Sequence, residues 1–166
     1  MELEEFRKRK DEFLKNGQDS PISAEERSSF SGLKYFPENP DLRLLVPLTH
    51  APEEEFEFET SSGERKSFKR IGKLGFSVEG QAAELTLYQA ASGSFFLPFR
   101  DLTSGKETYG AGRYVEIKKI GENFELDFNY AYNPYCAYNS GYSCPLPPLE
   151  NWLKVPITAG EMNYHG

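Results

Sequence analysis

The N-terminal part of the chain carries a helical pattern. Over residues 3–16, apolar side chains recur every three or four positions among charged ones, which predicts an amphipathic helix. Ser23 begins a capping-box pattern that predicts a second, short helix over residues 24–30. We therefore expect residues 1–31 to form an N-terminal helical segment.

After a proline-containing turn at residues 36–40, the apolar period falls from near 3.6 to near 2, the repeat of a strand with one buried face. Turn residues separate the runs about every 8–12 residues, a spacing typical of antiparallel sheets. The pattern predicts a mainly β fold, an antiparallel sandwich or partly open barrel of about eight strands, in a single β domain over residues 32–166. Alternating runs lie at residues 42–48, 56–58, 68–78, 85–88, 95–99, 115–117 and 124–130.

The C-terminal segment from residue 131 onward has neither period. Prolines and glycines interrupt it, so long regular elements are not expected. Several apolar side chains between Leu146 and Ile157 nevertheless require burial. We expect this Pro- and Tyr-rich segment to cap the domain by crossing the sheet, and we expect any site to lie at that junction.

Charge and composition narrow the possible partners. The 166 residues include 26 acidic and 19 basic side chains, a net charge of −7 that repels the phosphates of nucleic acids. The chain has no apolar run long enough to span a bilayer and no signal-peptide pattern, so we expect a cytoplasmic protein without a membrane partner. Common phosphate, dinucleotide and zinc-protease motifs are absent, and we expect no cofactor. The oligomeric state stays open.

Three motifs in the second half of the chain resemble a known family. Residues 99–114 read FRDLTSGKETYGAGRY, residues 126–138 read LDFNYAYNPYCAY, and residues 144–151 read CPLPPLEN, with Ala-Gly-Glu following at 159–161. Together they are similar to the family known as domain of unknown function 1684, over most of the chain from about residue 32. The resemblance implies membership of a family with no established activity, cofactor or partner.

Arg113 is the first candidate for site chemistry. Period 2 places Asp127 and Asn129 on the same face of one predicted strand, and counting from the hairpin turn places Arg113 opposite this pair. Asp101 is a second candidate partner. Arg113 would either clamp an anionic ligand or form an ion pair that ties a loop to the sheet. The ion pair is favoured, because an inward-facing arginine is usually paired.

A series of tyrosines and asparagines, including Tyr132, Asn133 and Tyr138, forms a second candidate group. Tyrosine rings with polar tips and asparagine amides suit sugars and other polar small molecules. The same side chains also pack over a sheet with each hydroxyl satisfied locally. The packing interpretation has somewhat more weight.

Cys136 and Cys144 have four possible roles. A nucleophilic thiol needs a base, and the only histidines are His50 and His165, the latter near the C-terminus. Zinc binding lacks obvious further ligands, and a disulfide needs an oxidising compartment. Reduced, buried thiols are favoured, and we expect no metal site.

These observations lead to one preferred function and two alternatives. We predict a site for a small polar or anionic molecule where the sheet meets the C-terminal segment. The alternatives are a hydrolase-like enzyme using Asp127, Glu150 or Cys136, and a structural or interaction protein without a ligand site; whether the chain is an enzyme stays open. The predicted ligand-binding residues are Asp101, Arg113, Asp127, Asn129, Tyr132, Asn133, Cys136 and Tyr138.

Overall fold

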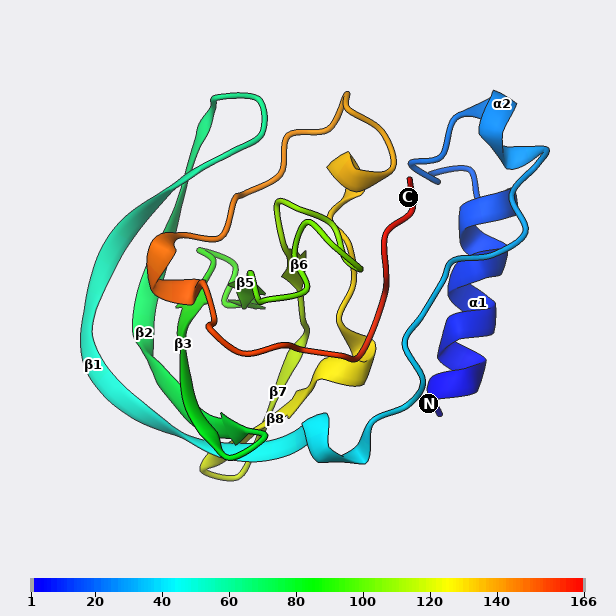
Figure 1. The fold of residues 1–166 in the computed structure, drawn as a ribbon. Coiled ribbons are helices and arrows are strands. Elements are labelled where there is room, and N and C mark those ends of the chain that lie inside the picture. The colour runs from blue at the N-terminus through cyan, green and yellow to red at the C-terminus, as the bar shows by residue number, and fades with distance from the viewer. Residues whose placement is uncertain (1, 166) are drawn as a thin grey trace.

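The computed structural model describes residues 2–165, and a curved antiparallel sheet forms most of it (Figure 1). The strands are β1 (Arg43–Glu59), β2 (Arg65–Val78), β3 (Gln81–Gln89), β4 (Phe95–Phe96), β7 (Ile117–Ile120) and β8 (Asn123–Asp127). They are ordered β4-β3-β2-β1-β8-β7 and curl into a nearly closed barrel. A second sheet contains only β5 (Pro98–Phe99) and β6 (Arg113–Tyr114). The predicted mainly β fold is confirmed.

β1 is one long strand where the sequence pattern predicts two. Its first half pairs with β8 and its second half with β2, and its pairing with β2 shifts register between His50 and Glu54. A second shift, between Arg70 and Gly72, interrupts the pairing of β2 with β3. Such bulges bend strands and increase their twist. β1 therefore continues along the curved wall through residues 49–55, where the apolar alternation is interrupted.

The main core lies inside this curved wall. Inward-facing residues of the sheet pack with apolar residues of the C-terminal segment, which crosses the open side of the sheet as predicted (Figure 1). This packing explains how a segment without strand or helix periodicity stays ordered, because burial of apolar surface stabilises it. Fully buried members include Leu74, Leu85, Leu87, Leu97, Phe99, Leu126, Phe128, Ile157 and Ala159.

The N-terminal helix α1 (Leu3–Asn16) agrees with the prediction and lies beside the barrel, away from β1 to β3 (Figure 1). The helix α2 (Ala24–Arg27) is shorter than predicted. After it, the hydroxyls of Ser28 and Ser29 donate to the carbonyls of Glu25 and Glu26, and such local bonds compete with helix propagation. Within residues 2–165, every helix is too short or too polar to cross a bilayer.

Four short 3-10 helices occur in the connections. Three of them lie in the irregular part of the chain after β8, where they turn the backbone without forming a long element. The 3-10 helices are η1 (Pro40–Leu42), η2 (Phe128–Tyr130), η3 (Tyr135–Ala137) and η4 (Leu149–Asn151).

Gly112 provides a test of how tightly the chain before β6 packs between β5 and the C-terminal segment. Its φ is +100°, and an added Cβ would lie 2.5 Å from the Phe99 carbonyl oxygen and 2.9 Å from Pro147 Cγ. We expect Gly112→Ala to lower the free energy of unfolding by about 3 kcal/mol, because the clash adds to the left-handed strain. Gly105→Ala is the matched control, since its φ is +84° and nothing lies within 4 Å of the added Cβ. Urea unfolding showing equal losses for both variants would contradict this packing.

Candidate functional site

Arg113 is fully buried, and its guanidinium bonds to the C-terminal segment. Nη1 donates to the carbonyls of Ala159 (2.6 Å) and Glu161 (3.1 Å), and Nη2 donates to the carbonyl of Ile157 (2.9 Å). These carbonyls belong to alternate residues, which face the same side of an extended chain. One side chain thus satisfies three backbone acceptors in a segment without a regular ladder.

Asp101 is the charge partner of Arg113. Arg113 Nη2 lies 3.5 Å from Asp101 Oδ1, and Oδ2 accepts bonds from the Ile157 N–H (2.7 Å) and the Thr103 hydroxyl (2.8 Å). Burial lowers the pKa of Arg113, and the Asp101 carboxylate opposes that shift. The geometry matches the favoured interpretation of an ion pair that ties a loop to the sheet.

The predicted contact of Arg113 with Asp127 and Asn129 is wrong. β8 ends at Asp127, whose carboxylate caps η2 by accepting from the Asn129 N–H at 3.0 Å. The Asn129 side chain bonds instead to the backbone N–H and carbonyl of Asn39. Arg113 belongs to β6 and pairs with Phe99, because the β7–β8 hairpin register does not continue back to residue 113.

Asn133 and Tyr138 meet at Glu161, whose side chain is 1% exposed. Glu161 Oε1 accepts from the Asn133 N–H (3.1 Å) and the Tyr138 hydroxyl, and Oε2 pairs with Lys10 of α1. Burial, followed by the charge of Glu161, raises the pKa of Tyr138. Lys10 is absent from the predicted set, although the sequence held a signal for it: a lysine in line with the apolar stripe of the first helix.

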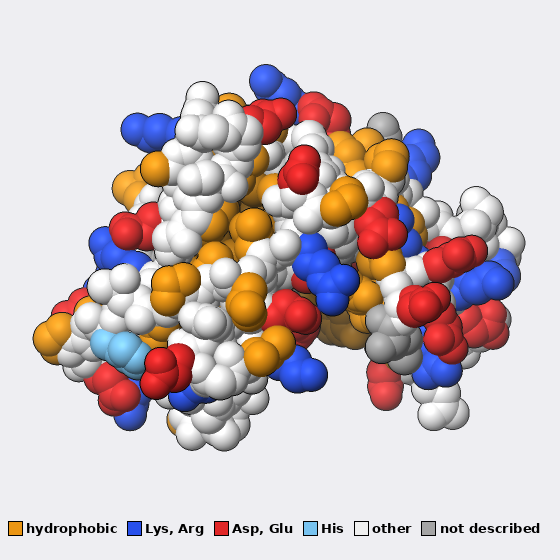
Figure 2. All heavy atoms as spheres, turned by 90° about the horizontal axis from the view of Figure 1, so that it is seen from below, with side chains coloured by type: hydrophobic (Ala, Val, Ile, Leu, Met, Phe, Trp, Pro, Cys, Tyr) orange, Lys and Arg blue, Asp and Glu red, His pale blue; other side chains and the backbone are white. Residues whose placement is uncertain are grey.

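A cleft of about 1300 Å³ opens between α1 and the strands β7 and β8. In Figure 2 it is seen as a hollow with apolar side chains in its depth and charged side chains on both sides. Three predicted residues line it, namely Asp127, Asn129 and Tyr132. The Tyr132 hydroxyl donates to Glu116 Oε1 at 3.0 Å, and Lys10 Nζ lies 5.0 Å from the centre of the Tyr132 ring. The aromatic residues that line the cleft are Phe6, Phe13, Tyr130, Tyr132 and Tyr135.

The other predicted residues lie outside this lining. Arg113 and Asp101 are buried in the contact with the C-terminal segment, while Asn133 and Tyr138 reach the cleft wall only through Glu161 and Lys10. Cys136, next to the lining residue Tyr135, is partly exposed and contacts Cys144. Among residues 2–165, no three His, Cys, Asp or Glu side chains gather in a way that would hold a metal ion.

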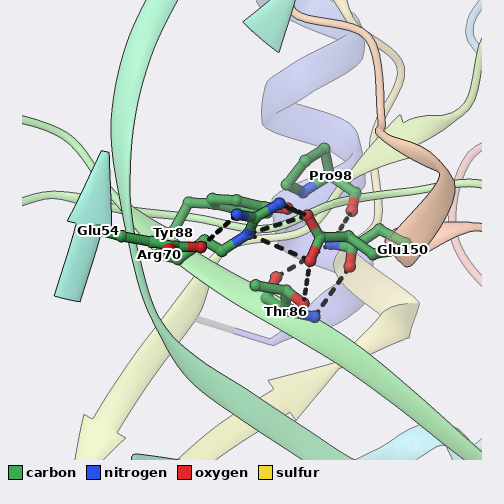
Figure 3. A network of polar contacts seen from close by, with 7 residues as sticks. Glu54, Arg70, Thr86, Tyr88, Pro98 and Glu150 are labelled. Carbon is green, nitrogen blue, oxygen red and sulfur yellow. Dashed lines mark hydrogen bonds and ion pairs between the residues drawn. The ribbon is translucent and has the colours of Figure 1, made fainter. Parts of the chain in front are cut away.

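Glu150 belongs to a separate polar network that joins η4 to β2 and β3 (Figure 3). Its carboxylate accepts from the Tyr88 hydroxyl (2.7 Å), the Thr86 hydroxyl (2.9 Å) and Arg70 Nε (3.0 Å). Burial alone would raise the pKa of Glu150, but the hydrogen bonds from Arg70, Tyr88 and Thr86 outweigh it, so the pKa is lowered. The neighbouring Asn151 side chain accepts from the Thr86 N–H and donates to the Thr86 carbonyl, as the backbone of a paired strand would.

The fold and the cleft define a small, mainly β protein in which a buried arginine holds an irregular C-terminal segment and a helix forms one wall of a cleft. Residues 28–162 match the model of the family described as protein of unknown function (DUF1684), and the chain belongs to this family. An uncharacterized protein of Haloarcula marismortui, solved by solution NMR, is 38% identical, with a TM-score of 0.73 and coverage of 96% of this chain and 91% of that chain. The comparison with curated proteins gives no match.

The Arg113–Asp101 pair is testable by a double-mutant cycle. We expect Arg113→Met to lower the free energy of unfolding by about 3–5 kcal/mol, because it leaves a buried carboxylate without its counter-charge. Asp101→Asn is expected to cost about 2–4 kcal/mol for the converse reason. The double variant should cost less than the sum, since the two groups contact each other. Additive losses in chemical unfolding would contradict direct coupling, and the exposed Arg65→Met serves as control.

The Glu150 network predicts a pH dependence. A carboxylate whose pKa is lowered by folding contributes stability that is present above its unfolded pKa and is lost as the pH falls through its folded pKa. We expect Glu150→Gln to lower the free energy of unfolding at pH 7 by about 1–3 kcal/mol, and the difference from the parent protein to shrink below about pH 4. Thermal unfolding from pH 7 to pH 3 measures this. A pH-independent difference would contradict the assignment, and the exposed Glu122→Gln is the control.

Proposed function

We propose that this protein binds a small polar molecule in the cleft between α1 and the strands β7 and β8. The lining of the cleft carries the proposal, because five aromatic side chains and several charged groups meet there. Its volume of about 1300 Å³ exceeds the usual range of about 300–1,000 Å³ for a ligand site and leaves room for a small molecule. Aromatic walls with a few polar groups are the usual composition of such sites. The cleft also adjoins the 3-10 turns after β8, near the junction where the sequence predicts a site.

The charge of the lining favours a positively charged ligand over an anion. Its basic residues are Arg9, Lys10, Arg43 and Lys118, and of these Lys10 is already paired with Glu161. Aromatic faces also attract cations. We infer a ligand with an amine or guanidinium group on an apolar body. The acidic lining residues are Glu2, Glu4, Glu38, Glu116, Glu125 and Asp127.

Two features weigh against the other candidate functions. Arg113, the expected anion clamp, is 0% exposed, and both of its terminal nitrogens already have protein partners. Asp127, Glu150 and Cys136, the candidate hydrolytic residues, contact different partners in three separate networks. Paired acid–base catalysis needs groups that converge on one reacting atom. Binding is therefore the function that the geometry supports best.

An NMR titration with 2-phenylethylamine and 3-phenylpropionate, probes of similar size and opposite charge, tests the proposal. We expect the amine to shift resonances of Tyr132 and its neighbours with a dissociation constant of about 1 mM or tighter, and the carboxylate to bind at least about tenfold more weakly. The double variant Glu116→Gln/Glu125→Gln should weaken amine binding about fivefold, from about 0.5 kcal/mol per removed charge.

The control is Glu55→Gln/Glu57→Gln on β1, which changes the net charge equally but leaves the cleft lining intact. It should leave the dissociation constant unchanged. Tighter binding of the carboxylate would overturn the inferred charge of the ligand. Shifts confined to residues outside the cleft, or no shifts with about 10 mM of either probe, would overturn the site itself.

A further inference from the structure

Cys136 and Cys144 lie together at the surface of the C-terminal segment. The Cys136 N–H donates to Cys144 Sγ at 3.3 Å, and the Tyr109 hydroxyl lies 3.6 Å from Cys136 Sγ. Both thiols are free; Cys136 is partly exposed, whereas Cys144 is 7% exposed. The pair thus combines a partly exposed cysteine with a buried one.

The turn between β1 and β2 holds Cys144 in place. The Ser61 N–H donates to the Cys144 carbonyl at 3.0 Å, and the Cys144 N–H donates to the Ser61 hydroxyl at 3.0 Å. Because both backbone groups of Cys144 are bonded to the barrel, its sulfur stays beside Cys136 without rearrangement of the loop. The Cys136 backbone and the Cys144 sulfur are therefore held in contact by the fold.

The pKa values of the two thiols are shifted in opposite directions. The hydrogen bond from the Cys144 thiol, with further bonds from Tyr109 and Ser61, outweighs burial and lowers the pKa of Cys136 to about 6. The same hydrogen bond between the two side chains, followed by burial, raises the pKa of Cys144. At neutral pH Cys136 is therefore the thiolate, which is the reactive form, and Cys144 keeps its proton.

We propose that Cys136 and Cys144 form a modification site for hydroperoxides, with Cys136 as the attacking thiolate and Cys144 as the resolving thiol. This site is independent of the proposed ligand cleft. Such a site needs an accessible cysteine, a neighbour that stabilises its thiolate by a hydrogen bond, and a second thiol close by. Cys136 is the partly exposed cysteine, Tyr109 is the neighbour, and Cys144 is the second thiol.

The chemistry has two balanced steps. The Cys136 thiolate attacks one peroxide oxygen, an S–O bond forms as the O–O bond breaks, and hydroxide or alkoxide leaves; the sulfur loses two electrons and the peroxide gains them. The leaving anion takes the proton of the Cys144 thiol. The Cys144 sulfur then attacks the sulfenic sulfur of Cys136, an S–S bond forms, and the S–O bond breaks to release water after protonation.

The test uses the full chain, hydrogen peroxide and thiol counting at pH 7. We expect the parent protein to lose both free thiols, to lose two hydrogens in mass and to recover both with dithiothreitol. Cys144→Ser should instead accumulate a sulfenic acid at Cys136 that dimedone captures, whereas Cys136→Ser should leave Cys144 unreacted. The oxidation rate of the parent should exceed that of free cysteine about tenfold, since more of its thiol is ionised.

Tyr109→Phe separates a positioned pair from two ordinary thiols. Removal of this hydroxyl should slow oxidation about threefold or more and move the pH profile of Cys136 alkylation upward, because the thiolate loses a donor. Thermal unfolding of each variant establishes that it is folded. The proposal is overturned by equal peroxide reactivity of both single-cysteine variants, by oxidation no faster than that of free cysteine, or by disulfides only between two molecules.

Discussion

The buried guanidinium of Arg113 is the constraint on which the C-terminal third of the structure depends. The extended stretch from Ile157 to Glu161 has apolar side chains in the core, so its carbonyls cannot turn to water without exposing them. Three of those carbonyls point to one cation, and hydrogen bonds to a charged donor are stronger than neutral ones. Burying a charge is costly unless it is paired, and Asp101 supplies that pairing while also holding the Ile157 N–H. Single backbone bonds join Gly160 to Phe36 and Glu161 to Ala131, and the Arg113 side chain supplies the other bonds that a strand partner would give.

A second ion pair, between the buried Glu161 and the partly buried Lys10, extends this arrangement to the N-terminal helix. Glu161, whose backbone carbonyl bonds to Arg113, pairs through its carboxylate with Lys10 of α1. The helix is therefore fastened to the same stretch of chain that Arg113 orders, and the cleft exists because α1 contacts this stretch while standing apart from β7 and β8. Phe6 of α1 and Tyr130, whose ring centres lie 4.9 Å apart, both line the cleft. The shape of the cleft consequently depends on groups that lie outside it.

Local patterns predicted the elements but not the long-range partners. The helix over residues 3–16, the mainly β fold and the hairpin turn before β8 follow from periodicity and turn chemistry, which act between near neighbours. The continuity of β1 was missed, because a bulge carries the strand through residues without alternation. Extending the hairpin register of β7 and β8 beyond Ile117 gives Arg113 the wrong partners, because Arg113 precedes β7 and pairs with Phe99 in the small sheet. Asp101 was the correct alternative, and only the packed fold shows that both charges are buried.

Burial divides the eight predicted site residues more clearly than residue type does. Arg113, Asp101, Asn129, Asn133 and Tyr138 are buried, and their polar groups bond to backbone or to neighbouring side chains, except Arg113 Nε and Asn133 Oδ1, which have no hydrogen-bond partner within residues 2–165. A ligand could reach them only by displacing bonds whose loss would leave buried polar groups unsatisfied, at a cost of about 1–3 kcal/mol each. Asp127, Tyr132 and Cys136 are partly exposed, and contact with a ligand or oxidant demands no such exchange. We therefore expect ligands and oxidants to contact these partly exposed residues. The buried residues hold in place the backbone that carries them.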